Sequence, residues 1–221
     1  FNLLRKKYLL GENFSNKQIQ PSSVDLTLSN ECYQICASFL SSSNTVRNNL
    51  KKTILKRIDL SKKYLFKKNK TFIVKLNETL CLSDNIFGIC NPKSSTGRLD
   101  IFCRTILDYS DEYEKIPSNY KGEMFIEITS RSFNIEFQEG DSLNQMRLIF
   151  DKHVYINDDD LKKFHDKFFL TLDQNNNKIK PNISNGLKIG VDLSNENKIN
   201  AYVAKHNAPI LCYQKIRNHN V

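Results

Sequence analysis

The residues best suited to chemistry lie close together in the stretch 91–100, which reads NPKSSTGRLD. Two adjacent hydroxyls, Ser94 and Ser95, are flanked by the cations Lys93 and Arg98. Hydrogen-bond donors at short range, combined with charge neutralisation, are what a polyphosphate requires. The spacing of a Walker loop is absent. The stretch therefore predicts either a phosphate-binding loop or a turn in which Ser94 or Ser95 caps a short helix.

Short apolar runs separated by turn residues must position this stretch. Residues 23–28 alternate apolar and polar side chains with period two, as a half-buried strand does. Comparable runs follow at 31–37, 71–76, 86–90, 101–107, 123–129, 133–137 and 145–150. Strands at this spacing predict a mainly β fold, a distorted barrel or sandwich with a few short helices, and not a βαβ sheet.

Helical periodicity is confined to two stretches. Residues 45–56 place apolar side chains four apart, and residues 158–169 open with three acids that suit the positive end of a helix dipole. We predict one domain over 1–172 and a polar linker over 173–185. The remainder, 186–221, has strand-like runs such as 208–213 but is too short for a full domain.

The composition and net charge of the chain exclude few classes of function. The 221 residues carry a formal charge of +9, which favours anionic partners, although runs of Lys and Asn also fit solvated loops. The six cysteines contain no Cys-x-x-Cys pair and fit buried thiols in a reducing, cytoplasmic compartment. No signal peptide or membrane-spanning stretch is evident. Because the chain starts at Phe1, we expect a fragment of a longer product.

Four motifs, in the same order, resemble the dCTP deaminase family. They are residues 20–26 (QPSSVDL), 92–100 (PKSSTGRLD), 120–122 (YKG) with Ile126 and Glu127, and 140–147 (GDSLNQMR), the last shared with dUTPases. The second motif is most similar to the long bacterial members with two tandem halves. The resemblance implies a dUTPase-like β-barrel or jelly-roll, with 186–221 as the start of a second, incomplete half.

The resemblance also assigns roles. Glu127 matches the general base that activates water for attack on cytosine C4. Ser94 matches the serine that positions this water or the tetrahedral intermediate, and Arg98 matches an arginine that balances charge beside the glutamate. Lys93 and Ser95 fall on positions that contact the triphosphate. Lys93 replaces an arginine, so it supplies charge without the bidentate fork.

The implied reaction converts dCTP and water to dUTP and ammonia. A carboxylate that cycles between base and acid can move both protons. The His-x-Glu and Pro-Cys-x-x-Cys signatures of zinc deaminases are absent. We therefore expect no zinc, with Mg²⁺ bound only through the triphosphate. The family also implies a homotrimer with active sites at subunit interfaces, or a pseudo-trimer if the protein carries tandem halves.

Three positions leave alternatives open. Pro117 stands where short family members carry an aspartate for the sugar 3′-hydroxyl, so Asp108 or Asp111 takes this role or the site has drifted. Gln145 fits either a nucleotide contact or an amide satisfied inside the barrel. Asp25 fits a structural role, pairing with a neighbouring strand or with a trimer mate, better than a catalytic one.

Other functions remain as alternatives. A dUTP diphosphatase, alone or bifunctional, would need an aspartate in the middle motif and a Gly-rich C-terminal arm, and neither is visible. A truncated, non-catalytic nucleotide binder is compatible with Pro117 and the short C-terminal segment. A nucleic-acid binder or membrane-bound protein is disfavoured, because no basic patch interleaved with aromatic residues and no spanning stretch is found.

Overall fold

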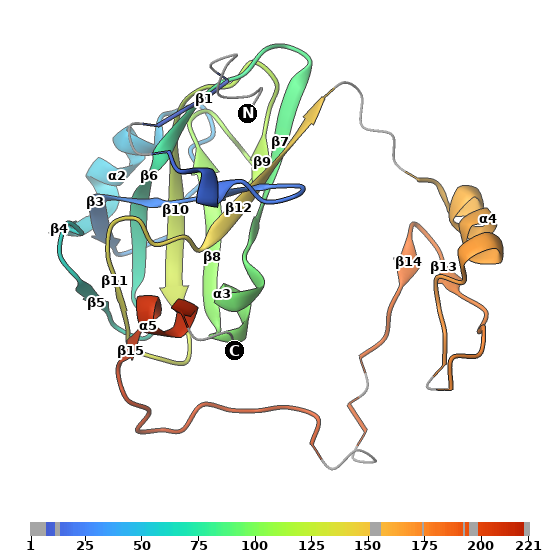
Figure 1. The fold of residues 1–221 in the computed structure, drawn as a ribbon. Coiled ribbons are helices and arrows are strands. Elements are labelled where there is room, and N and C mark those ends of the chain that lie inside the picture. The colour runs from blue at the N-terminus through green and yellow to red at the C-terminus, as the bar shows by residue number, and fades with distance from the viewer. Residues whose placement is uncertain are drawn as a thin grey trace. The chain divides into compact units, whose positions relative to one another are not determined.

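The computed structural model describes residues 8–11, 14–150, 156–173, 175–191, 193–194 and 199–218 (Figure 1). Over these residues the fold is mainly β with a few short helices, which confirms the predicted class. The strands are β1 (Leu9–Leu10), β2 (Val24–Leu26), β3 (Leu28–Ile35), β4 (Ile54–Asp59), β5 (Tyr64–Phe66), β6 (Thr71–Cys81), β7 (Ile86–Pro92), β8 (Ile101–Leu107), β9 (Lys115–Ile116), β10 (Lys121–Ser130), β11 (Ile135–Phe137), β12 (Asn144–Phe150), β13 (Asn182–Ile183), β14 (Leu187–Lys188) and β15 (Leu211–Cys212). The helices are η1 (Asn16–Gln18), α2 (Val46–Thr53), α3 (Ser94–Arg98), α4 (Asp158–Phe168) and α5 (Tyr213–Asn218).

The chain forms two compact units, residues 1–151 with 204–221 and residues 152–203. These bounds differ from the predicted ones at 172 and 185. Helix α4 belongs to the second unit, because Asp158 at its first turn accepts the backbone N–H groups of Asn185 and Gly186 at 2.9 Å. That 186–221 opens a second deaminase-like half stays a prediction.

Three sheets build the first unit. Their strand orders are β4-β3-β6-β10-β8, with β1 also on β6, then β2-β12-β7-β9, and β15-β11-β5. Apolar side chains from all three sheets meet in one core, among them Leu26, Phe66, Val74, Cys90, Ile126, Phe137 and Met146. None of the helices within the described residues is long and apolar enough to cross a membrane.

Strand β10 is buried on both faces. Met124, Ile126 and Ile128 point into the main core, whereas Phe125 and Glu127 alternate with them on the opposite face. Helix α2 covers part of this opposite face, where its Val46 and Leu50 join a second cluster with Ile73, Ile106 and Phe125. Helix α2 does not cover the rest of this face, which carries Glu127 and Thr129 of β10.

Two local predictions need correction. The helix expected over 45–56 ends at Thr53, because Ile54 already pairs with Ile35 as the first residue of β4. The strand expected over 208–213 is reduced to Leu211–Cys212, which pairs in parallel with β11, and Tyr213 begins α5.

The return of the C-terminal segment to the first unit depends on Tyr213. Its ring is 2% exposed and lies 5.2 Å from that of Phe137, and its hydroxyl donates to the carbonyl of Ser142 at 2.7 Å. We therefore expect Tyr213→Ala to lower the free energy of unfolding by about 3–5 kcal/mol. Tyr213→Phe, which removes only the hydrogen bond, should cost about 1 kcal/mol. Urea unfolding of both variants is the measurement, and equal losses would contradict this packing.

Candidate active site

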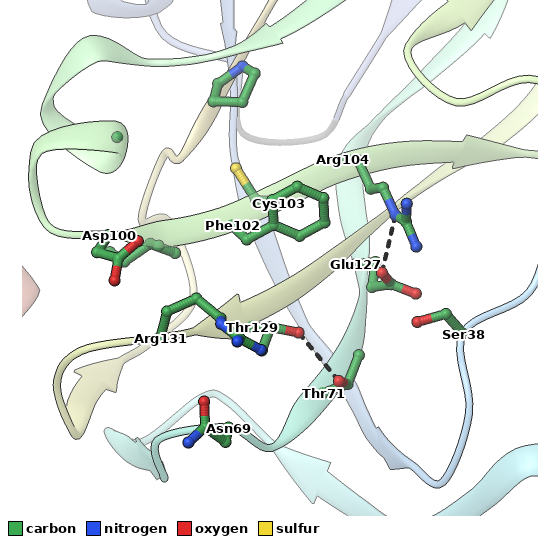
Figure 2. A pocket seen from close by; sticks show the side chains of 13 residues that line it. Ser38, Asn69, Thr71, Asp100, Phe102, Cys103, Arg104, Glu127, Thr129 and Arg131 are labelled. Atoms are coloured by element: carbon green, nitrogen blue, oxygen red, sulfur yellow. Dashed lines mark hydrogen bonds and ion pairs between the residues drawn. The ribbon is translucent and has the colours of Figure 1, made fainter.

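A pocket of about 690 Å³ opens on the part of the sheet β6-β10-β8 that α2 leaves uncovered (Figure 2). The pairing of the strands sets the lining side chains opposite one another. Glu127 on β10 pairs with Arg104 on β8, and Thr129 on β10 pairs with Thr71 on β6. The hydroxyls of Thr71 and Thr129 are 3.0 Å apart. The alternation of three neighbouring strands thus gathers polar side chains on one surface.

Glu127 is the most buried acid of this pocket, with a side chain 2% exposed. Its Oε1 accepts a hydrogen bond from Nε of Arg104 at 2.9 Å, which makes a charge-assisted pair. Its Oε2 is buried and has no hydrogen-bond partner within the described residues. A buried carboxylate oxygen without a donor is costly, so it marks a place where a water or a ligand is expected.

Arg104 is itself held by aromatic rings. Its guanidinium carbon lies 3.6 Å from the ring centre of Tyr113 and 5.2 Å from that of Phe102. The hydroxyl of Tyr113 donates to the carbonyl of Phe39 at 3.2 Å, which fixes the ring. Stacking and a directed hydrogen bond leave the guanidinium little freedom, so it positions the carboxylate of Glu127.

The other end of the pocket contains Asp100, Arg131 and Asn69 (Figure 2). Asp100 accepts a hydrogen bond from the hydroxyl of Ser132 at 2.6 Å, and its carbonyl accepts the N–H of Arg131 at 2.9 Å. Near Glu127, the hydroxyl of Ser38 faces into the pocket. The pocket therefore presents a carboxylate at each end, Glu127 and Asp100, and several hydrogen-bonding groups between them.

A second polar group lies on the sheet β2-β12-β7. Lys93 forms an ion pair with Asp25, which is 2% exposed, and the hydroxyl of Ser23 donates to Oε1 of Gln145 at 3.0 Å. Gln145 lies opposite Asp25 in the β2–β12 register. This arrangement supports the structural interpretation of Asp25. It also brings together two residues predicted to contact the triphosphate, Lys93 and Gln145.

The short helix α3 carries the remaining predicted residues. Ser94 and Arg98 are exposed at its two ends, and Ser95 is half-buried. The expectation that Ser94 or Ser95 caps a helix is wrong, because Lys93 occupies the N-cap position and no side chain accepts from the turn. The buried Thr96 anchors α3 instead, by donating its hydroxyl to the carbonyl of Leu143 at 2.9 Å.

The predicted residues thus fall into separate groups. Glu127 lines the pocket, whereas α3 borders it through Gly97 and the other predicted side chains are not among its lining residues. The cation in contact with Glu127 is Arg104, and the predicted place of Arg98 beside this glutamate stays a prediction. Among the described residues, no group of three His, Cys, Asp or Glu side chains has the arrangement of a metal site.

Asp108 and Asp111, the two residues considered for sugar recognition in place of Pro117, lie in different surroundings. Asp108 accepts the N–H of Val46 at 2.7 Å, so it stabilises the start of α2. Asp111 is exposed, and its proposed role stays a prediction. The nearby Glu114 is instead structural: burial raises the pKa of its carboxyl, while hydrogen bonds from Asn144 and Thr105 oppose that rise.

Sequence reasoning missed Arg104 and Tyr113. Arg104 is the one charged residue in the strand run Ile101–Leu107, and a single charge in an apolar run is a usable signal for a buried pair. Tyr113 lies in an irregular loop, where no periodicity indicates which way a side chain points. Its contact with Arg104 follows only from the fold.

The pairing of Arg104 with Glu127 can be tested by stability. Arg104→Ala leaves a buried carboxylate without its cation, so we expect the free energy of unfolding to fall by about 3–5 kcal/mol at neutral pH. Adding Glu127→Gln to the same chain should recover most of this loss, because the uncompensated charge is removed. Urea unfolding of the two single variants and the double variant provides the cycle. Strictly additive losses would contradict the pair.

Comparisons with known proteins agree with the motifs. The model of the 2′-deoxycytidine 5′-triphosphate deaminase (DCD) N-terminal domain matches residues 2–152. The crystal structure of 2′-deoxycytidine 5′-triphosphate deaminase from Agrobacterium tumefaciens is 32% identical, with a TM-score of 0.86 over 100% of this chain and 65% of that chain. This chain therefore spans about two thirds of the length of that relative.

Two dUTPase structures are more distant. That of EIAV is 15% identical with a TM-score of 0.41 and covers 66% of this chain and 90% of its own. The dUTPase from phage phi11 of S. aureus is 11% identical with a TM-score of 0.38 and covers 66% and 92%. The domain match and the Agrobacterium structure confirm the resemblance inferred from the four motifs, and the chain belongs to the dCTP deaminase family.

Proposed function

We propose that this chain catalyses the hydrolytic deamination of dCTP to dUTP and ammonia, with Glu127 as the general base. The observation that carries the proposal is the state of its carboxylate. One oxygen is held by Arg104 at 2.9 Å, and the other is buried in the pocket without a partner among the described residues. Such a carboxylate is oriented, charge-balanced and open to a single water molecule.

The chemistry balances with one carboxylate. Oε2 of Glu127 takes a proton from the water as its oxygen bonds to C4 of cytosine and passes this proton to N3, which gives a neutral tetrahedral carbon. The carboxylate then takes the proton of the new C4 hydroxyl and donates it to the exocyclic nitrogen, the C4–N bond breaks, and ammonia leaves as the C4 carbonyl forms. Arg104 keeps the carboxylate in place throughout, and Ser94 stabilises the tetrahedral centre.

The size and lining of the pocket suit the base and sugar. A volume of about 690 Å³ is typical of a site for a small organic ligand. Phe102 is 50% exposed on this face and offers an aromatic surface to a nucleobase. The hydroxyls of Thr71 and Thr129 offer hydrogen bonds to polar groups of the nucleotide.

The triphosphate is the proposed ligand of Lys93, Ser95 and Gln145. These side chains present an ammonium, a hydroxyl and an amide, which are donors suited to phosphate oxygens and not a set of metal ligands. Mg²⁺ accordingly accompanies the nucleotide and screens its charge. Zinc has no role in this proposal, because the reacting water is activated by Glu127 alone.

A second copy completes the site in this proposal. Lys93 and Gln145 are tied to Asp25 and Ser23, whereas Glu127 occupies its own pocket on β10. A homotrimer, or a pseudo-trimer of tandem halves, joins Ser94 and the phosphate-binding side chains of one copy to the Glu127 pocket of the next. With closed symmetry, each copy gives its phosphate-binding side chains to one site and its Glu127 pocket to another.

The glutamate is tested by Glu127→Gln. This variant keeps the shape of the side chain but removes the proton acceptor, so we expect turnover of dCTP to fall by at least about 10²–10⁴-fold. Binding of dCTP, measured by calorimetry, should persist. Products resolved by chromatography in the presence of Mg²⁺ should be dUTP without dUMP for the unaltered chain.

The matched control is Glu136→Gln on β11, a half-buried glutamate outside the pocket. It should retain turnover. Equal activity of Glu127→Gln and the unaltered chain would remove Glu127 as the base. Formation of dUMP would instead make the enzyme bifunctional.

A further inference from the structure

Nearly all the net charge of the chain lies in one segment of twenty residues. We name residues 51–70 the basic segment: it holds one carboxylate, Asp59, and nine cations, Lys51, Lys52, Lys56, Arg57, Lys62, Lys63, Lys67, Lys68 and Lys70. Its formal charge of +8 compares with +9 for the entire chain. The remaining residues are therefore close to neutral.

The nine cations are exposed and unneutralised. All nine side chains are exposed, and none forms an ion pair with a carboxylate of the described residues. Lys56 and Arg57 lie instead over the rings of Tyr64 and Tyr33, at 5.1 and 5.8 Å. Lys56 and Arg57 on the edge strand β4 also hinder edge-to-edge pairing. That role does not explain the three lysines of the turn between β5 and β6.

This turn reaches the pocket of Glu127. Asn69 and Thr71 line the pocket (Figure 2). Lys67, Lys68 and Lys70 flank Asn69 in the turn between β5 and β6, so we take this turn as a rim of the pocket. Backbone hydrogen bonds hold the turn in place, from Lys70 to Lys67 at 3.1 Å and from Asn69 to Ser130 at 2.8 Å. The N–H of Lys68 also donates to the side chain of Asn134 at 2.8 Å.

The charged side chains that line the pocket give no net electrostatic attraction for an anionic ligand. These side chains are Asp100, Arg104, Glu127 and Arg131, two of each sign. A triphosphate approaching from solvent therefore responds to the field of the rim and not to that of the interior. At physiological ionic strength such a field extends over about 8 Å, which is enough to act at the mouth of a pocket.

We propose that the basic segment steers nucleoside triphosphates into the Glu127 pocket, with the turn 67–70 as its effective part. The inference rests on the proposed function, because it takes the nucleotide to be the ligand of this pocket. The segment raises the rate of association and leaves the chemical step unchanged. Lys93 and Gln145 hold the phosphates after arrival, whereas the rim lysines act before contact.

The test replaces the three rim lysines together, as Lys67→Gln, Lys68→Gln and Lys70→Gln. At about 0.02 M salt we expect kcat/KM for dCTP to fall about 10-fold, with kcat retained, and the difference to vanish near about 0.5 M salt. The control carries Lys162→Gln, Lys163→Gln and Lys167→Gln on α4. It makes the same change in net charge and should leave kcat/KM within about twofold.

Three results would overturn the inference. They are a loss of kcat/KM that persists unchanged at high salt, an equal loss in the α4 control, and an equal loss for the uncharged nucleoside deoxycytidine.

The association rate of a fluorescent dCTP analogue separates this inference from the proposed reaction. If the unaltered chain does not deaminate dCTP but the rim variant still slows association, the reaction fails and the steering stands. If turnover of dCTP is normal and the rim variant associates with the analogue at an unchanged rate, the proposed reaction stands and the steering fails.

Discussion

The register of β10 between β6 and β8 is the constraint on which the site depends. Side chains alternate across a strand, so the pairing that sends Ile126 and Ile128 into the core must send Glu127 to the opposite face. A shift of one residue would bury the carboxylate among apolar side chains. The same register sets Arg104 directly across from Glu127. Packing of the core and placement of the Glu127 carboxylate are thus one requirement.

The opposite face is divided between a packed region and an open pocket. Helix α2 covers one part with Val46 and Leu50, and the uncovered part is the pocket. Burying a carboxylate there is unfavourable unless a cation compensates it, and Arg104 does so while Tyr113 restrains Arg104. The second carboxylate oxygen of Glu127, without a partner among the described residues, is the remaining cost. Unsatisfied polar atoms of this kind are common where a protein binds a reacting molecule.

Local patterns and family motifs predicted different parts of this arrangement. Alternation located most strands, and the acidic first turn predicted a helix over 158–169, which the structure has at Asp158–Phe168 with Phe169 as its C-cap. The motifs predicted Glu127 and Lys93 as site residues, a role that stays a prediction, but they did not predict what these residues contact. Arg104 is 23 residues from Glu127 and Asp25 is 68 residues from Lys93, so both pairs exist only after the sheets form. The predicted serine cap of α3 is wrong, because no serine side chain caps this helix and the buried Thr96 anchors it instead.

In the proposed assembly, Glu127 of one copy acts together with Ser94 of the next copy. The most direct measurement mixes two variants, Glu127→Gln and Ser94→Ala, after subunit exchange verified with differently tagged chains. Each variant alone should be inactive towards dCTP, and random assortment should restore about one quarter of the activity of the unaltered protein. Absence of recovery in verified mixed assemblies would contradict the account, because both residues would then serve a site within one chain.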